Sequence, residues 1–185
     1  MVKAHRSNAM IHKLFNFSSS IVKFRMFTTF VHPIIEYASV IWALTKKGKI
    51  DIIEKIQKSF TKKLFPLDHQ TYEKCLNMLQ GMSLVNCWRF LDLLLVFQIM
   101  HHSNKLLSLE NLSIGVSSSS RHNMNLIPKL AINAIIDKEF LWRICCLWNY
   151  LPDDIKNYEH LNTFREKLLS WFDASQGNAM LCNFS

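Results

Sequence analysis

The spacing of hydrophobic residues along the chain is mostly helical. The clearest stripe is formed by Ile50, Ile53, Ile56, Phe60 and Leu64, which recur every three or four residues and therefore share one helix face. Lysines lie mostly outside this stripe and gather towards its end, where the helix dipole favours positive charge. The same spacing predicts further helices over residues 21–31, 34–42, 72–79, 84–102, 138–148 and 161–172.

Capping and breaking residues mark several helix ends. The serines at 18–20 offer N-caps for the helix that follows them. Pro33 predicts a kink or a new helix start, because proline removes one helical hydrogen bond and restricts the residue before it. Thr71 is expected to cap a short helix, and Gly81 is expected to stop it.

The pattern predicts an all-α fold. Only 4 glycines and 4 prolines are present, whereas β-sandwiches and barrels need frequent Gly/Pro turns. Residues 126–136 stay open between strand and helix, because a β-branched apolar run fits both. The expected organisation is a lead-in (1–19), a thumb-like basic helical bundle (20–102), a linker (103–125), a smaller C-terminal helical unit (126–172) and a tail (173–185).

Aromatic residues are frequent and could provide platforms for stacked bases. The chain has 5 tryptophans and 13 phenylalanines, but most of them occur at helical spacing among aliphatic residues. Phe140, Ile144, Leu147 and Trp148 follow this pattern, and we therefore expect Leu147 and Trp148 in a hydrophobic core.

No segment has the pattern of a membrane span or an export signal. The longest apolar stretch, residues 90–100, is interrupted by Asp92 and Gln98, and the N-terminus lacks the apolar centre of a signal peptide. We therefore expect a nuclear or cytoplasmic protein that is neither secreted nor membrane-bound. The cysteines are odd in number and lack framework spacing, so we expect them to be reduced and mostly buried: Cys75, Cys87, Cys145, Cys146 and Cys182.

Positive charge is concentrated in the first third of the chain. The net charge is +8; residues 1–66 hold 12 lysines and arginines against 3 acids, and residues 67–185 hold 10 against 11. This asymmetry predicts that one face meets a polyanion, with a merely solubilising surface as the alternative. The candidate nucleic-acid-binding residues are Lys46, Lys47, Lys49, Lys55, Lys58, Lys62 and Lys63.

These seven lysines are opposed only by Asp51 and Glu54. Both acids are expected in the first turn of a helix that begins at Ile50, after a polar turn at residues 45–49. The last four lysines would form a row away from the apolar stripe. Such a row would contact phosphates without reading bases, and a solvated helix face is the alternative.

Nothing in the chain assembles a convincing active site. Asp153 and Asp154 follow a proline in a helix-rich region, so we expect a turn and helix N-cap there, not a two-metal polymerase site. Cys75, Cys87 and the histidines at 101–102 lack the spacing of zinc ligands. We therefore expect no catalytic residue, no metal site and no cofactor in this chain.

Several short segments, in order over about residues 20–172, carry a set of motifs. The longest are VHPIIEYASVIW at 31–42 and IEKIQKSFTK at 53–62. They resemble V-R-P-I-L-E-Y-A-S-x-V-W and I-E-x-V-Q-R-R-F-T-K/R of jockey-type non-LTR retrotransposon reverse transcriptases. His32 stands where that family often has arginine, and Cys87-Trp88 where it has basic or polar residues. Partial matches follow at Tyr72-Glu73 with Leu76 and Leu79, at Ser83-Leu84, Arg89 and Asp92-Leu93, at Arg143 and residues 147–152, and at residues 161–165.

The resemblance implies the helical thumb of such a polymerase and the helical extension after it. The catalytic palm, where the parent RNA-directed DNA polymerase would use Mg²⁺, would lie upstream, and no catalytic residue carries over. This chain alone would therefore not be an enzyme but would bind the backbone of an RNA–DNA or DNA duplex. Two alternatives stay open: a stand-alone nucleic-acid-binding helical module, and a non-catalytic protein-interaction or structural remnant. Salt-dependent binding would separate them.

Overall fold

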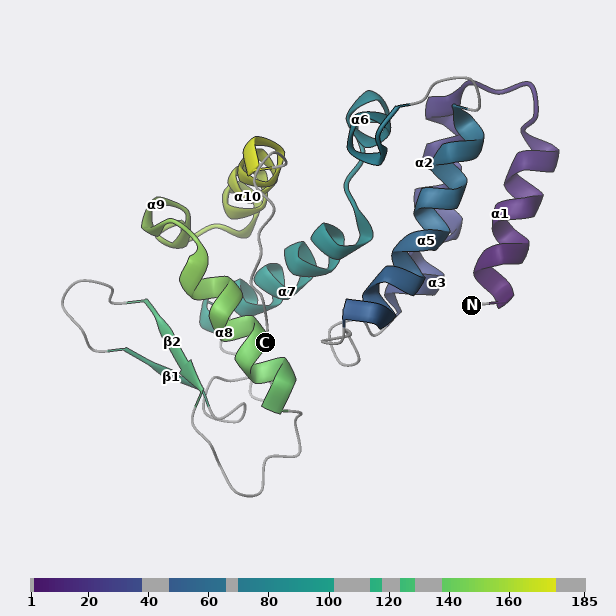
Figure 1. Ribbon diagram of the computed structural model, residues 1–185. Helices are drawn as coiled ribbons and strands as arrows, with labels where there is room; N and C mark the ends of the chain where they lie inside the picture. Colours follow the sequence, from purple (N-terminus) through teal and green to yellow (C-terminus); the bar gives the residue numbers. More distant parts are fainter. Residues whose placement is uncertain are drawn as a thin grey trace. The chain divides into compact units, whose positions relative to one another are not determined.

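The computed structural model describes residues 2–37, 47–65, 70–101, 114–117, 124–128 and 138–175 (Figure 1). Over these residues the secondary structure is helical except for one two-stranded ladder, which confirms the predicted all-α fold. The chain forms two compact units, Met1–Trp88 (unit 1) and Arg89–Ser185 (unit 2). The boundary between them lies inside one helix, α7 (Leu84–His101).

Unit 1 is built on three helices that lie side by side: α1 (Val2–Leu14), α2 (Ser20–Phe30) and α5 (Lys47–Leu64). The predicted apolar stripe of α5 faces the core through Ile53, Ile56 and Phe60. The Phe60 ring stacks on Phe27 of α2 with centroids 4.5 Å apart. The rest of this core consists of Ala4, Ile11, Phe24, Val31, Ile35, Leu76, Leu79, Leu84 and Trp88.

The break after α2 follows the predicted signals. Ser19 is the N-cap of α2, and its hydroxyl accepts a hydrogen bond from the Val22 amide at 3.4 Å. A new short helix, α3 (His32–Glu36), begins with Pro33 in its first turn, which confirms a fresh helix start. The helix predicted over residues 34–42 ends at Glu36 in the described structure, and residues 38–46 lie outside the described residues.

The connection between α6 (Tyr72–Met78) and α7 corrects the prediction for Gly81. Thr71 caps α6 as expected, but the residue with positive φ at the helix end is Gln80 (φ 51°). The Gly81 amide donates to the Leu76 carbonyl at 2.8 Å, as in a Schellman motif. Gly81 is needed for space, because a Cβ there would lie 2.4 Å from the Phe24 ring.

Unit 2 packs the later part of α7 with α8 (Lys138–Tyr150), α9 (Asp153–Lys156) and α10 (Leu161–Ser175). The Phe97 and Phe164 rings stack with centroids 4.2 Å apart, and Trp148 lies beside Phe164. Trp148 is fully buried, which confirms its predicted place in the core.

A short antiparallel pair, β1 (Ile114–Val116) and β2 (Leu126–Pro128), lies against α8. The Asn149 side chain accepts from the Leu126 amide at 2.8 Å and donates to the Leu126 carbonyl at 2.9 Å. Strand was one of the two alternatives left open for the run that begins at residue 126. The described part of that run is a strand, and the Asn149 side chain pairs the backbone amide and carbonyl of Leu126.

The domain organisation differs from the prediction in two places. Residues 2–14 form α1, which buries Ala4 and Ile11, and are therefore part of the bundle, not a lead-in. The division between units lies after Trp88, whereas the expected linker (103–125) contains β1, because the buried side chains of α7 are shared between two cores. Most of that linker and residues 176–185 of the expected tail lie outside the described residues.

By length and composition alone, α7 is the one helix in the described residues that could cross a membrane. Leu93, Val96 and Phe97 of this helix are buried in unit 2. Asp92 is buried as well and is ion-paired. A location away from membranes stays a prediction.

Candidate nucleic-acid interface

The lysines of α5 are the starting point of the candidate interface. Lys55, Lys58, Lys62 and Lys63 are all exposed. The helix begins at Lys47 instead of Ile50, so its first turn holds no acid, while its last turn holds two of the lysines, as expected. Lys47 and Lys49 belong to the helix, although their side chains are not described, and Lys46 lies outside the described residues.

The four described lysines do not form one row. Lys58 lies with its Nζ 5.3 Å from the centre of the Tyr72 ring, on the side of α5 that faces α6. Lys63 lies on the side that faces α1 and acts electrostatically on His12. The predicted single row is therefore split over two sides of the helix, since residues five positions apart are rotated by about 140°.

His12 joins Lys63 and Lys23 in a basic cluster drawn from three helices. The His12 ring contacts the Phe60 ring with centroids 4.6 Å apart. Burial lowers the pKa of His12, and the charges of Lys63 and then Lys23 lower it further. Its Nε2 is shielded from water without a hydrogen-bond partner among the described residues. Sequence reasoning missed His12 because residues 1–19 carried no visible helical stripe.

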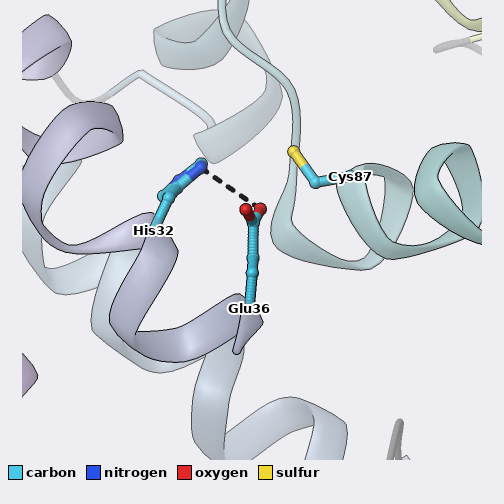
Figure 2. Close-up of side chains that lie close together, drawn as sticks. All are labelled: His32, Glu36 and Cys87. Carbon is cyan, nitrogen blue, oxygen red and sulfur yellow. Dashed lines mark ion pairs between the residues drawn. The ribbon is translucent and has the colours of Figure 1, made fainter. Parts of the chain in front are cut away.

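A second group of polar side chains lies inside unit 1, where α3 meets the start of α7. Figure 2 shows His32, Glu36 and Cys87 converging, and their ligand-type atoms all lie within 4.8 Å of one another. His32 Nδ1 is 3.4 Å from Glu36 Oε1. Burial lowers the pKa of His32, raises that of Glu36 and, together with the Glu36 charge, raises that of Cys87.

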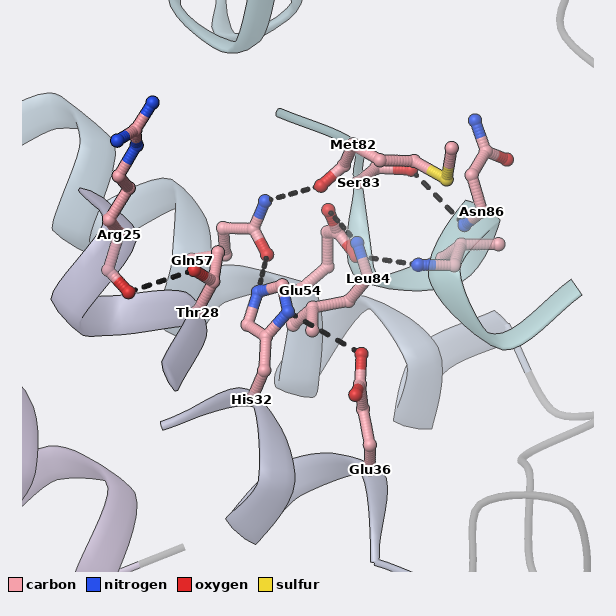
Figure 3. Close-up of polar contacts among 11 residues, drawn as sticks. Arg25, Thr28, His32, Glu36, Glu54, Gln57, Met82, Ser83, Leu84 and Asn86 are labelled. Carbon is pink, nitrogen blue, oxygen red and sulfur yellow. Dashed lines mark hydrogen bonds and ion pairs between the residues drawn. The ribbon is translucent and has the colours of Figure 1, made fainter. Parts of the chain in front are cut away.

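Gln57 determines which nitrogen of His32 carries hydrogen. Its Nε2 donates to the Met82 carbonyl at 2.8 Å, so its Oε1 is the atom 3.0 Å from His32 Nε2 (Figure 3). A carbonyl oxygen can only accept, and His32 Nε2 must therefore be the donor. In neutral His32 the lone pair of Nδ1 then points towards Glu36 and Cys87.

Glu54 is not the surface counter-charge that the sequence suggested. It is 5% exposed, and its carboxylate accepts a hydrogen bond from the Tyr72 hydroxyl at 2.5 Å. The carboxylate also accepts hydrogen bonds at 3.3 Å from the Leu84 amide (Figure 3) and from the Val85 amide. Burial raises the pKa of Glu54, and these hydrogen bonds oppose the shift. Glu54 thus caps α7 from a distance, where a helix N-terminus favours negative charge.

The surface of unit 1 consequently carries a larger excess of positive over negative side chains than its sequence composition indicates. In the described part of unit 1 the exposed acids are Asp51 and Glu73, because Glu54 is buried and Glu36 is half-buried. Such an excess of flexible cations can neutralise several phosphates of a polyanion. The exposed cations of the described part of unit 1 are Lys3, Arg6, Lys13, Arg25, Lys55, Lys58, Lys62, Lys63 and Lys74.

The other candidate residues are placed in the core or at helix ends. Asp153 and Asp154 are exposed in the first turn of α9, and Asp153 pairs with Lys156 at 3.2 Å. The N-cap of α9 is Pro152, so the two aspartates are not the N-cap but lie in the first turn that follows it. Among the described cysteines, Cys75 and Cys145 are buried and Cys87 and Cys146 are half-buried, while Cys182 is outside the described residues.

The chain was compared with known protein families, curated protein sequences and solved structures, and none of the three comparisons finds a significant match.

Proposed function

We propose that unit 1 binds the phosphate backbone of a nucleic-acid duplex without reading its sequence. In this proposal the chain is a C-terminal, thumb-region fragment of a non-LTR retrotransposon reverse transcriptase and has no polymerase activity of its own. The observation that carries the proposal is the separation of charge in unit 1. The described lysines of α5 are exposed, whereas Glu54 is buried where it caps α7 and Glu36 is half-buried beside His32.

The internal contacts support the resemblance on which the family assignment rests. His32 of the first motif bonds to Gln57 of the second, and Glu54 of the second bonds to Tyr72 of the third. In unit 2, Arg143 of a later motif pairs with Asp92. Residues of the motif segments are thus partners in space, although His32 itself departs from the family motif.

The cations of α5 suit backbone contact better than base recognition. Lys55 and Lys62 are exposed and lie on the face opposite the apolar stripe, and a lysine ammonium is a mobile point charge without the fixed donor geometry of arginine. Each phosphate neutralised on duplex DNA contributes about 0.9 to the slope of log affinity against log salt. Three or four contacts therefore predict a slope of about −3, which describes weak, sequence-independent binding.

The test is duplex binding by fluorescence anisotropy across a salt series. We expect Lys58→Gln/Lys62→Gln/Lys63→Gln to flatten the slope by about two to three units while the helical content stays unchanged, because these side chains are exposed. The matched control is Arg165→Gln/Lys167→Gln in unit 2, which removes exposed cations from α10 and should leave the slope within about 0.5 of wild type. RNA–DNA and DNA duplexes of unrelated sequence should bind alike.

Equal slopes in wild type and the triple variant would mean that the lysines are a solvated face and would overturn the proposal. A slope that falls equally in the control would mean that net charge alone attracts the duplex, which contradicts an interface on unit 1.

One observation favours a second candidate, a protein-interaction role. Leu14, Phe17, Ile21 and Phe30 of unit 1 are exposed large apolar side chains, and Phe17 is completely exposed. Large apolar side chains that are exposed to solvent are one feature of protein interfaces. If the salt series shows no binding, sedimentation velocity of wild type and of Phe17→Ser/Ile21→Ser would test self-association through these side chains. A sedimentation coefficient that rises with protein concentration in wild type, but not in the variant, is the supporting result.

A further inference from the structure

We infer that His32, Glu36 and Cys87 form a binding site for a divalent transition-metal ion of the Zn²⁺ class, which joins α3 to the first turn of α7. Figure 2 shows the three side chains pointing towards one another from these two helices. Imidazole nitrogen, carboxylate oxygen and thiolate sulfur are the three donors that proteins use for zinc. The inference is independent of nucleic-acid binding.

The distances fit a tetrahedral ion. Two ligand atoms that each lie about 2.0 Å from a tetrahedral ion are about 3.3 Å apart. His32 Nδ1 and Glu36 Oε1 are 3.4 Å apart, and the Cys87 sulfur lies within 4.8 Å of both. A His-x-x-x-Glu spacing on one helix presents the first two ligands on the same face, so only the thiol needs to move inward by about 1 Å.

The orientation of the imidazole is already that of a metal ligand. Gln57 accepts from His32 Nε2 and is held in turn by the Met82 carbonyl, which leaves Nδ1 as the atom with the lone pair. Histidines that bind metals usually donate their other N–H to such an oxygen, which sets both tautomer and ring angle. Among the described residues, the partner of the Glu36 carboxylate is His32, and no described lysine or arginine is ion-paired with it.

Charge and access also fit. One divalent ion balances the charges of the Glu36 carboxylate and the Cys87 thiolate, so the occupied site is neutral. The thiol proton passes to solvent when the S–metal bond forms. Glu36 and Cys87 are only half-buried, which leaves a route for the ion and a fourth position for water.

The test uses the full chain, reduced and stripped of metal, with Co²⁺ as the spectroscopic probe. We expect one equivalent to bind with a sulfur-to-cobalt charge-transfer band and the intense visible bands of four-coordinate cobalt. Cys87→Ser should abolish the charge-transfer band, and His32→Gln should remove tight binding. Cys146→Ser is the matched control, because Cys146 is a half-buried cysteine in unit 2, and it should leave the spectrum unchanged.

Gln57 acts here as a positioning residue. Gln57→Leu should weaken Co²⁺ binding by about 10–100-fold, whereas Gln57→Glu, which keeps an acceptor for Nε2–H, should retain it. Circular dichroism of each variant separates loss of the site from loss of the fold. Folded wild type without the charge-transfer band would overturn the inference and would leave a proton as the cation shared by His32 and Glu36. A band that persists in Cys87→Ser would place the metal elsewhere and would overturn it equally.

Discussion

Arg143 donates a hydrogen bond of 2.9 Å from its Nε to Oδ2 of Asp92, and both side chains are almost completely buried in unit 2. Burial raises the pKa of Asp92 to about 6, although the Arg143 charge opposes that shift. A buried ion pair of this kind makes each partner necessary to the other, because either charge alone would be stranded away from water.

We therefore expect Asp92→Leu and Arg143→Leu each to lower the free energy of unfolding by about 3–5 kcal/mol at neutral pH. The double variant should cost less than either single one, since two apolar side chains of similar volume leave no stranded charge. Urea denaturation of wild type, the two single variants and the double variant gives the coupling free energy of this double-mutant cycle. Additive losses would contradict coupling between the two residues.

The pKa of Asp92 also predicts a pH dependence. Because the folded carboxyl holds its proton up to about pH 6 and the unfolded one loses it near 3.8, the stability from this group is present below the unfolded pKa and is lost as the pH rises to about 6. The difference in unfolding free energy between wild type and Asp92→Asn should therefore change over that window and be constant above it. A difference that is flat from pH 4 to 7 would disprove the raised pKa.

The α6–α7 connection offers a test of two neighbouring residues. Gly81→Ala should destabilise unit 1 by about 1–3 kcal/mol, because the new Cβ would collide with the buried Phe24 ring. Gln80→Gly should stabilise it by up to about 1 kcal/mol, since glycine accepts positive φ without strain. Thermal unfolding of the two variants is the measurement. We expect the melting temperature to fall in Gly81→Ala and to rise in Gln80→Gly, relative to wild type.

Trp148 should contribute to stability and not to base stacking. Its indole is fully buried and its Nε1 donates to the Met124 carbonyl at 2.8 Å. Trp148→Ala should cost about 3–5 kcal/mol. Trp142→Ala is the matched control on the same helix, because Trp142 is 58% exposed and its loss should change stability by no more than about 0.5 kcal/mol. An unchanged melting curve for Trp148→Ala would contradict the packing of α8.

Duplex binding should strengthen in mild acid through His12. Burial and the charges of Lys63 and Lys23 keep the free imidazole neutral near neutral pH, and a bound phosphate would favour its protonated form. Affinity should therefore rise as the pH falls through and below the ordinary imidazole pKa of 6.5, and His12→Gln should remove most of this rise. Anisotropy titrations at constant salt provide the measurement, and parallel pH profiles for the two proteins would exclude His12 from the interface.

Much of the local structure of this protein could be predicted from its sequence. The apolar stripe of α5, the Ser19 and Thr71 caps and the restart at Pro33 each depend on residues within one or two helical turns. Backbone hydrogen bonding and side-chain burial over so short a range leave a periodic pattern that can be read directly. The helix α1 could not be predicted from the sequence, because its mean hydropathy is low and its apolar face is narrow.

The candidate sites depended on contacts that no local pattern encodes. Glu54 looked like a surface acid beside lysines, yet it caps α7 thirty residues later in the chain. His32 and Cys87 meet where α3 and the start of α7 each hydrogen-bond to α5, through Gln57 and Glu54. Lys63 reaches His12 because α1 lies beside α5. The sequence by itself determined which segments are helical and where they end, since these depend on neighbouring residues. Tertiary structure alone decided which charges remain on the surface, because burial is set by partners that are distant along the chain.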